Sequence, residues 1–68
     1  MTNDYDVICY DNKDKIVYKI FYRGCLADLL QMMRNGYVKF SEYTKHNYKS
    51  EIICYLTQYA KVEVIKHV

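Results

Sequence analysis

The chain lacks proline and tryptophan and has only two glycines among its 68 residues. This scarcity excludes a linker-like or low-complexity polypeptide, in which glycine and proline accumulate. No apolar run approaches the roughly 18 residues that a membrane-spanning helix needs. The sequence therefore predicts one soluble globular domain over residues 1–68. Its core must be thin, so a homodimer that buries further surface is also expected.

The chain has three cysteines. Cys9, Cys25 and Cys54 are odd in number and far apart in the sequence. The first residues are polar and acidic, unlike the apolar core of a secretory signal. These two features predict reduced thiols in a cytoplasmic protein. Paired spacings such as C-x-x-C or H-x-x-x-H are missing, so no metal ion and no other cofactor is expected.

The sequence does not favour a catalytic nucleophile either. Cys25 lies near the predicted start of a helix, where a thiolate is stabilised. A nucleophilic cysteine also needs a histidine base, and His46 and His67 are both remote from Cys25 in the sequence. We therefore interpret Cys25 as a small packing residue, predict no catalytic residue, and expect a protein that is not an enzyme.

The first third of the chain is typical of a β-hairpin. Residues 5–10 are β-branched and aromatic, residues 16–23 alternate with period two, and the turn-rich tetrad Asp11-Asn12-Lys13-Asp14 separates them. The alternation gives the second strand an apolar or aromatic face that should cover the core, made of Ile16, Tyr18, Ile20 and Tyr22. The opposite face carries Val17, Lys19, Phe21 and Arg23, and we expect it to be solvated or to contact a partner.

A helix is predicted over residues 25–35. Its core-facing stripe, at the spacing i, i+3, i+4 and i+7, consists of Leu26, Leu29, Leu30 and Met33. The pair Asn35-Gly36 supplies the left-handed residue that ends the helix.

The second half of the chain is harder to interpret. Residues 37–46 fit either a short strand or an extended connection. A second helix is predicted from Asn47, as its N-cap, to Tyr59 or Ala60, with Ile52, Leu56 and Tyr59 as its stripe. Residues 62–68 alternate as a closing strand. The predicted fold is α+β, a small antiparallel sheet in β-β-α-α-β order with two helices on one face. The closing strand should join one edge of the sheet and leave the other edge open.

Tyrosine is what the chain has in abundance, with nine copies. An apolar ring with a polar tip suits either the edge of a core or a contact surface, and tyrosine and arginine are enriched at the energetic centres of interfaces. Four rings exceed what a small core can bury: Tyr37, Tyr43, Tyr48 and Tyr55. The predicted partner-binding residues are Arg34, Tyr37, Tyr43, Lys45 and Tyr48. The competing interpretation is that several of these rings cap the edges of the core.

Charge supports an alternative function. Residues 1–14 are mainly acidic, whereas residues 15–49 carry an excess of lysine and arginine. A basic middle segment with aromatic neighbours is typical of nucleic-acid binding. The residues predicted for a small nucleic-acid-binding regulator are Lys19, Arg23, Lys39, Lys45 and Lys49. Strand geometry disfavours nucleic-acid binding, because Phe21 is the one aromatic residue on the face that carries Lys19 and Arg23.

The segment NDYDVICYDNKDKIVYKIFYRGCLADLL, residues 3–30, resembles the uracil-DNA glycosylase inhibitor of small Bacillus phages. The shared features are a Tyr-Asp-Val strand, an acidic turn, a tyrosine-rich strand ending in a basic residue and glycine, and a Leu/Asp helix. That inhibitor is acidic and inserts aromatic and acidic helix residues, whereas the helix here offers Leu30, Gln31, Met32 and Met33. No site residue is therefore carried over from it.

The order of elements is also similar to that of small phage antitoxins that block a host RNase toxin. Together these resemblances imply a class of function. They imply a bacteriophage protein in the host cytoplasm that binds one host protein and inhibits or redirects it, without a membrane partner.

Overall fold

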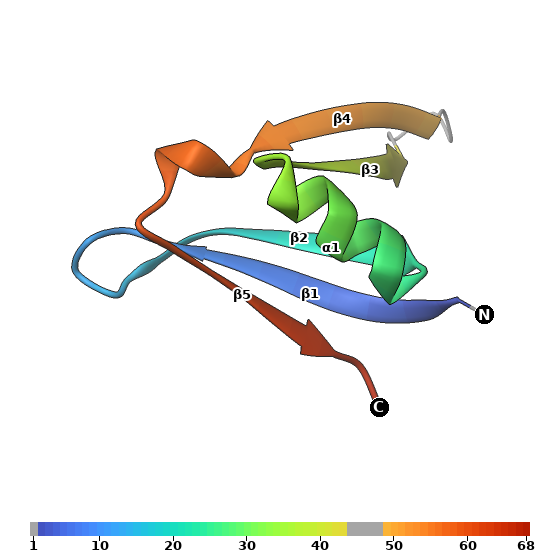
Figure 1. Cartoon of the computed structure of the whole chain (residues 1–68), viewed down its shortest axis with the longest axis horizontal. Helices are drawn as coiled ribbons and strands as arrows, with labels where there is room; N and C mark the ends of the chain where they lie inside the picture. The colour runs from blue at the N-terminus through green and yellow to red at the C-terminus, as the bar shows by residue number, and fades with distance from the viewer. Residues whose placement is uncertain (1, 44–48) are drawn as a thin grey trace.

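The computed structural model describes residues 2–43 and 49–68 (Figure 1). These residues form the elements β1 (Asn3–Tyr10), β2 (Ile16–Gly24), α1 (Leu26–Arg34), β3 (Tyr37–Tyr43), β4 (Lys49–Tyr55), the 3-10 turn η1 (Leu56–Gln58) and β5 (Lys61–Lys66). Strands β2, β1 and β5 make an antiparallel sheet in that order, and β3 pairs with β4 in a separate antiparallel ribbon. As predicted, the closing strand joins the hairpin at one edge.

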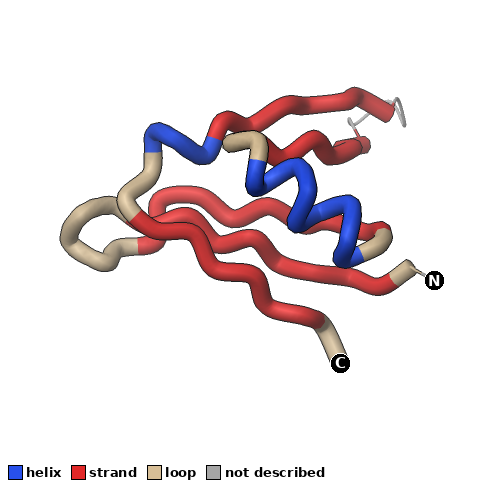
Figure 2. The backbone as a smooth tube through the Cα atoms, in the orientation of Figure 1, coloured by secondary structure: helices blue, strands red, loops and turns tan. Residues whose placement is uncertain are grey.

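The core lies between the two sheets and α1, which follow one another as separate layers in Figure 2. Every element contributes to it or packs against it. The buried residues of the cluster are Tyr5, Val7, Cys9, Ile20, Leu29, Val38, Phe40, Cys54 and Leu56. Because the side chains of a strand alternate, each sheet then turns its other face outward.

The predicted hairpin turn is confirmed. The Oδ1 atom of Asp11 accepts hydrogen bonds from the backbone N–H groups of Lys13, at 2.8 Å, and Lys15, at 3.0 Å. Asp14 takes the left-handed conformation with φ of 61°. The predicted core face of β2 is correct only in part, since Ile20 is buried but Ile16, next to the projecting turn, is exposed (Figure 1).

The predicted helix is confirmed, and so is its end at Gly36, which has φ of +88°. Its predicted stripe was half wrong. Leu29 is fully buried and Met33 packs against the core, but Leu30 is 45% exposed and Leu26 is also exposed. A helix of nine residues presents only a narrow strip to the core, and Met32 completes it.

The prediction of a second helix, and with it the predicted fold class, was wrong. The described part of that segment is β4 followed by η1, and residues 37–43 are the strand β3. The chain is therefore mostly β, with α1 as the one α-helix in the described residues. Strand β4 is rich in β-branched and aromatic residues (KSEIICY), which favour a strand. No helix in the described residues is long and apolar enough to cross a membrane.

Candidate protein-binding surface

The β3–β4 ribbon has one buried face and one exposed face. Val38 pairs with Cys54 and Phe40 with Ile52, and these side chains lie in or against the core. The alternating pairs point the other way. This second set, which we call the outer ribbon face, consists of Tyr37, Lys39, Ser41, Glu51, Ile53 and Tyr55. Because one face of the ribbon covers the core, the alternating side chains of the other face are exposed.

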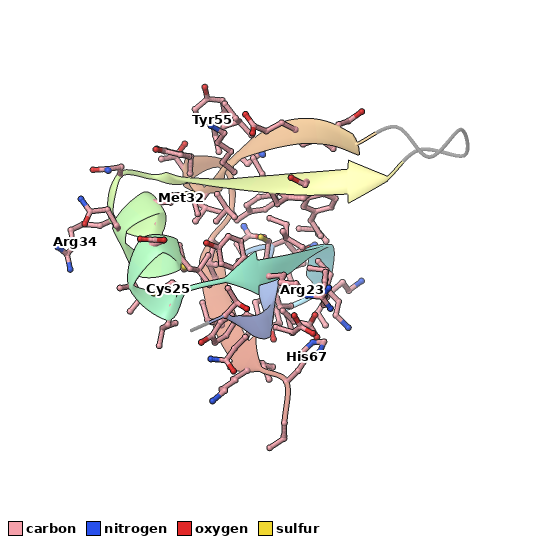
Figure 3. The ribbon with its side chains drawn as sticks, turned by 90° about the vertical axis from the view of Figure 1, so that its right-hand side faces the viewer. Arg23, Cys25, Met32, Arg34, Tyr55 and His67 are labelled. Carbon is pink, nitrogen blue, oxygen red and sulfur yellow. The ribbon has the colours of Figure 1, made fainter. Side chains whose placement is uncertain are left out.

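The outer ribbon face exposes large apolar side chains. Ile53 is 49% exposed and Tyr55 is 62% exposed. Figure 3 shows Tyr55 projecting from the ribbon, away from the other strands. An open hollow of about 270 Å³ is lined by Tyr37, Lys39, Ile53 and Tyr55. Aromatic and apolar side chains around a hollow, with polar groups beside them, are typical of the centre of a protein interface.

One ion pair crosses this face. Lys39 Nζ lies 3.1 Å from Glu51 Oε1, and both side chains are exposed. Such exposed pairs contribute little to stability, on the order of 0–1 kcal/mol. The pair instead places one charge of each sign beside the apolar hollow. The face therefore carries both a hydrogen-bond donor and an acceptor next to Ile53.

Of the predicted partner-binding residues, Tyr37 lies on the outer ribbon face, directly opposite Tyr55. Arg34 is exposed in the last turn of α1 and points away from Tyr55 in Figure 3. Tyr43 ends β3, but its side chain lies outside the described residues, as do Lys45 and Tyr48 entirely. The structure thus places Tyr37 opposite Tyr55, whereas Arg34 points away from Tyr55.

The predicted site residues did not include Ile53 and Tyr55, although Tyr55 was among the four rings in excess of the core, and both residues were placed on a helix. The signal that identifies them is the period-two alternation of residues 50–55, in which Glu51, Ile53 and Tyr55 occupy one face.

The basic residues of the alternative prediction do not form one surface. Lys19 and Arg23 lie on the outward face of β2, whereas Lys39 lies on the ribbon. Lys45 and the side chain of Lys49 lie outside the described residues.

Of these predicted basic residues, the three whose side chains the structure describes each lie near a carboxylate. Lys19 Nζ lies 3.6 Å from Asp6, Arg23 Nε lies 2.7 Å from Asp4, and Lys39 pairs with Glu51. The hydrogen bond from Arg23 lowers the pKa of Asp4, so this carboxylate stays charged. A phosphate would have to compete with a carboxylate at each position.

The outward face of the three-stranded sheet is a second exposed surface with apolar residues. Phe21 is half exposed, and the Arg23 guanidinium lies 5.7 Å from its ring centroid. The imidazole of His67 lies 5.6 Å from the same ring. This aromatic ring is therefore flanked by side chains of its own chain, whereas Tyr55 projects from the ribbon.

The structure also locates the groups considered for catalysis. Cys25 precedes α1, and Figure 3 shows it on the helix side, whereas His67 lies on the opposite side of the sheet with Asp6. His46 lies outside the described residues. Within residues 2–43 and 49–68, no group of three His, Cys, Asp or Glu side chains could hold a metal ion.

No protein-family model, no curated protein and no solved structure matches this chain.

Proposed function

We propose that this chain is a small non-catalytic binding module that contacts another protein through the outer ribbon face. The observation that carries the proposal is the cross-strand pair of Tyr37 and Tyr55 beside the exposed Ile53, around an open hollow. Rings of this kind supply a large contact area at a low cost in side-chain entropy. An exposed apolar cluster with a polar rim is a surface that a partner would cover.

The kind of partner follows from the resemblance to small phage inhibitors. We infer a protein of a bacterial host, bound in the host cytoplasm and inhibited or redirected by occupation of its surface. The ion pairs of Lys19, Arg23 and Lys39 support a protein partner over a nucleic acid, because these cations already face carboxylates.

Capture from a bacterial lysate tests the proposal. A tagged chain is incubated with nuclease-treated and untreated lysate, and the retained proteins are identified by mass spectrometry. We expect one stoichiometric protein that survives nuclease. Retention that disappears with nuclease would contradict the proposal and favour the nucleic-acid alternative, whose binding also weakens steeply with salt.

A matched pair of variants then locates the surface. Ile53 on the ribbon and Ile65 on β5 are exposed to a similar extent, 49% and 45%. We expect Ile53→Thr to weaken binding of the purified partner about tenfold, or about 1.4 kcal/mol, and Ile65→Thr to leave it unchanged. Equal losses in both variants, or a loss only for Ile65→Thr, would place the surface elsewhere.

A further inference from the structure

Strand β4 has an open edge. In Figures 1 and 3, β4 is the outermost strand, and β3 separates it from α1 and β2. Strand β3 also contacts α1 and β2. Within the residues that the structure describes, β3 is the only strand paired with β4. An open edge presents unpaired backbone N–H and C=O groups, which can pair with another strand.

The hydrogen bonding identifies which residues face this edge. The Leu56 N–H donates to the Gly36 carbonyl at 2.9 Å, which continues the β3–β4 register. In an antiparallel pair, such directly bonded positions alternate with positions whose backbone groups point outward. Residues 52 and 54 therefore bond to β3, whereas residues 51, 53 and 55 turn their backbone groups to the open edge.

Two contacts confirm this alternation. The Tyr55 carbonyl accepts a hydrogen bond from Gln58 Nε2, at 3.1 Å, and not from β3. On β3, the Lys39 N–H donates to the Sδ atom of Met32, at 3.4 Å, on the side away from β4. The residues that face the open edge are thus Glu51, Ile53 and Tyr55, which also carry the exposed side chains of the outer ribbon face.

We propose that β4 pairs antiparallel with β4 of a second copy of this chain, around a two-fold axis at Ile53. This register places Ile53 opposite Ile53 of the second copy, and Glu51 opposite Tyr55 twice. All three residues turn their backbone groups outward, so the ladder is satisfied on both strands. The carbonyl of Tyr55 has a second lone pair and keeps its bond from Gln58.

Side-chain complementarity favours a second copy as the occupant. An isologous contact needs a self-complementary surface. Across this axis the Tyr55 hydroxyl is a donor opposite the Glu51 carboxylate, and the two isoleucines meet at the centre. An axis at Glu51 would place two carboxylates opposite each other, which is destabilising. The strand is therefore self-complementary around Ile53 and not around Glu51.

Such a dimer would join the two ribbons into one four-stranded sheet in the order β3-β4-β4-β3. A two-fold axis perpendicular to the sheet keeps the same face outward in both copies. The two outer ribbon faces would then become one continuous surface with two hollows. The proposed partner surface would double in size. Each chain would also bury surface in addition to that of its small core.

Oligomeric state of the purified chain tests this proposal. We expect light scattering after gel filtration to show twice the 8.2 kDa chain mass for the wild type. Ile53→Pro removes an outward N–H that β3 does not use, so the variant should be a folded monomer. Lys66→Pro is the matched change on the outer edge of β5 and should remain a dimer.

A second variant separates loss of pairing from loss of folding. Ile53→Lys keeps the backbone and places like charges opposite each other across the axis, so it should also be a monomer, with an unchanged circular dichroism spectrum. A wild-type chain that is monomeric at millimolar concentration would overturn the proposal. Dimers that persist in both Ile53 variants, or that Lys66→Pro abolishes, would also overturn it.

The proposal does not depend on the proposed function, since no partner is present in these measurements. A dimer that captures no host protein would support this inference and contradict the proposed function. A monomer that captures a host protein, and loses it in Ile53→Pro to a much greater extent than in Ile53→Thr, would show that the open edge takes a strand of that protein. That result would overturn the second-copy proposal and leave the proposed function standing.

Discussion

The Nε2 atom of His67 lies 2.9 Å from Oδ1 of Asp6, and the His67 N–H donates to the Asp4 carbonyl at 2.8 Å. These contacts connect the residue that follows β5 to the central strand β1. The hydrogen bond from His67, with the charges of His67 and Lys19, lowers the pKa of Asp6 against the opposing effect of burial. Asp6 is therefore more acidic in the folded chain than its ordinary value of 3.8.

This relationship predicts a dependence of stability on pH. A carboxyl with a lowered folded pKa stabilises the folded state above its unfolded pKa, near 3.8, and this contribution is lost as the pH falls through the folded pKa. We expect thermal unfolding temperatures of wild type and Asp6→Asn to differ at pH 6 and to converge toward pH 2. Asp14→Asn, in the hairpin turn, is the control. A difference that stays constant over this range would contradict the prediction.

Adjacent leucines on α1 should differ sharply in their contribution to stability. Leu29 is fully buried, whereas Leu30 is 45% exposed. We expect Leu29→Ala to lower the free energy of unfolding by about 2–5 kcal/mol, because it leaves a cavity in a small core. Leu30→Ala should change it by less than about 0.5 kcal/mol. Urea unfolding followed by circular dichroism measures both, and equal effects would show that the helix packs differently.

The end of α1 depends on the conformation of Gly36. Its φ is +88°, and an added Cβ would meet only the Thr57 methyl at 3.6 Å, so backbone strain and not a clash decides the cost of a side chain. We expect Gly36→Ala to cost about 1 kcal/mol of stability. Gly36→Asn should cost less, since asparagine tolerates this region better. An unfolding temperature of Gly36→Ala that equals or exceeds that of the wild type would contradict this ranking.

The three thiols should react at different rates. Cys9 is fully buried and Cys54 nearly so, whereas Cys25 is partly exposed. Burial, together with the charge of Cys54, raises the pKa of the Cys9 thiol, which disfavours the reactive thiolate. We expect a colorimetric thiol reagent to label one cysteine per folded chain quickly, and none in Cys25→Ser. Rapid labelling of two or three cysteines in the native chain would be inconsistent with the burial of β1 and β4.

The assignment of the second half shows where sequence reasoning fails. Ile52 and Leu56 are four residues apart, a spacing that places two side chains on one side of either a helix or a strand. Within the stripe only Tyr59, at i+7, favoured the helix, and Asn47 as an N-cap was the other argument for it. In the structure Tyr59 packs against the core because the turn η1 interrupts the strand direction after Tyr55. The three predicted core residues are therefore all at the core, although the element that carries them differs.

The candidate site could be predicted only in part for the same reason. Tyr37 was named, and it lies on the outer ribbon face. Its neighbours Ile53 and Tyr55 lie on β4, for which the sequence predicted a helix. Cross-strand neighbours are distant in sequence, and their identity depends on the register between two strands.

The local features of this protein follow from short stretches of its sequence. The Asp11 turn depends on a side chain that bonds its own backbone, and the end of α1 depends on a glycine that can take positive φ, so both follow from a few adjacent residues. The buried face of β4, and the pairing of the chain after Gly36 as a ribbon, depend instead on contacts between distant segments. Those outcomes depend on the free energy of packing against β1, β2 and α1, which no local pattern contains.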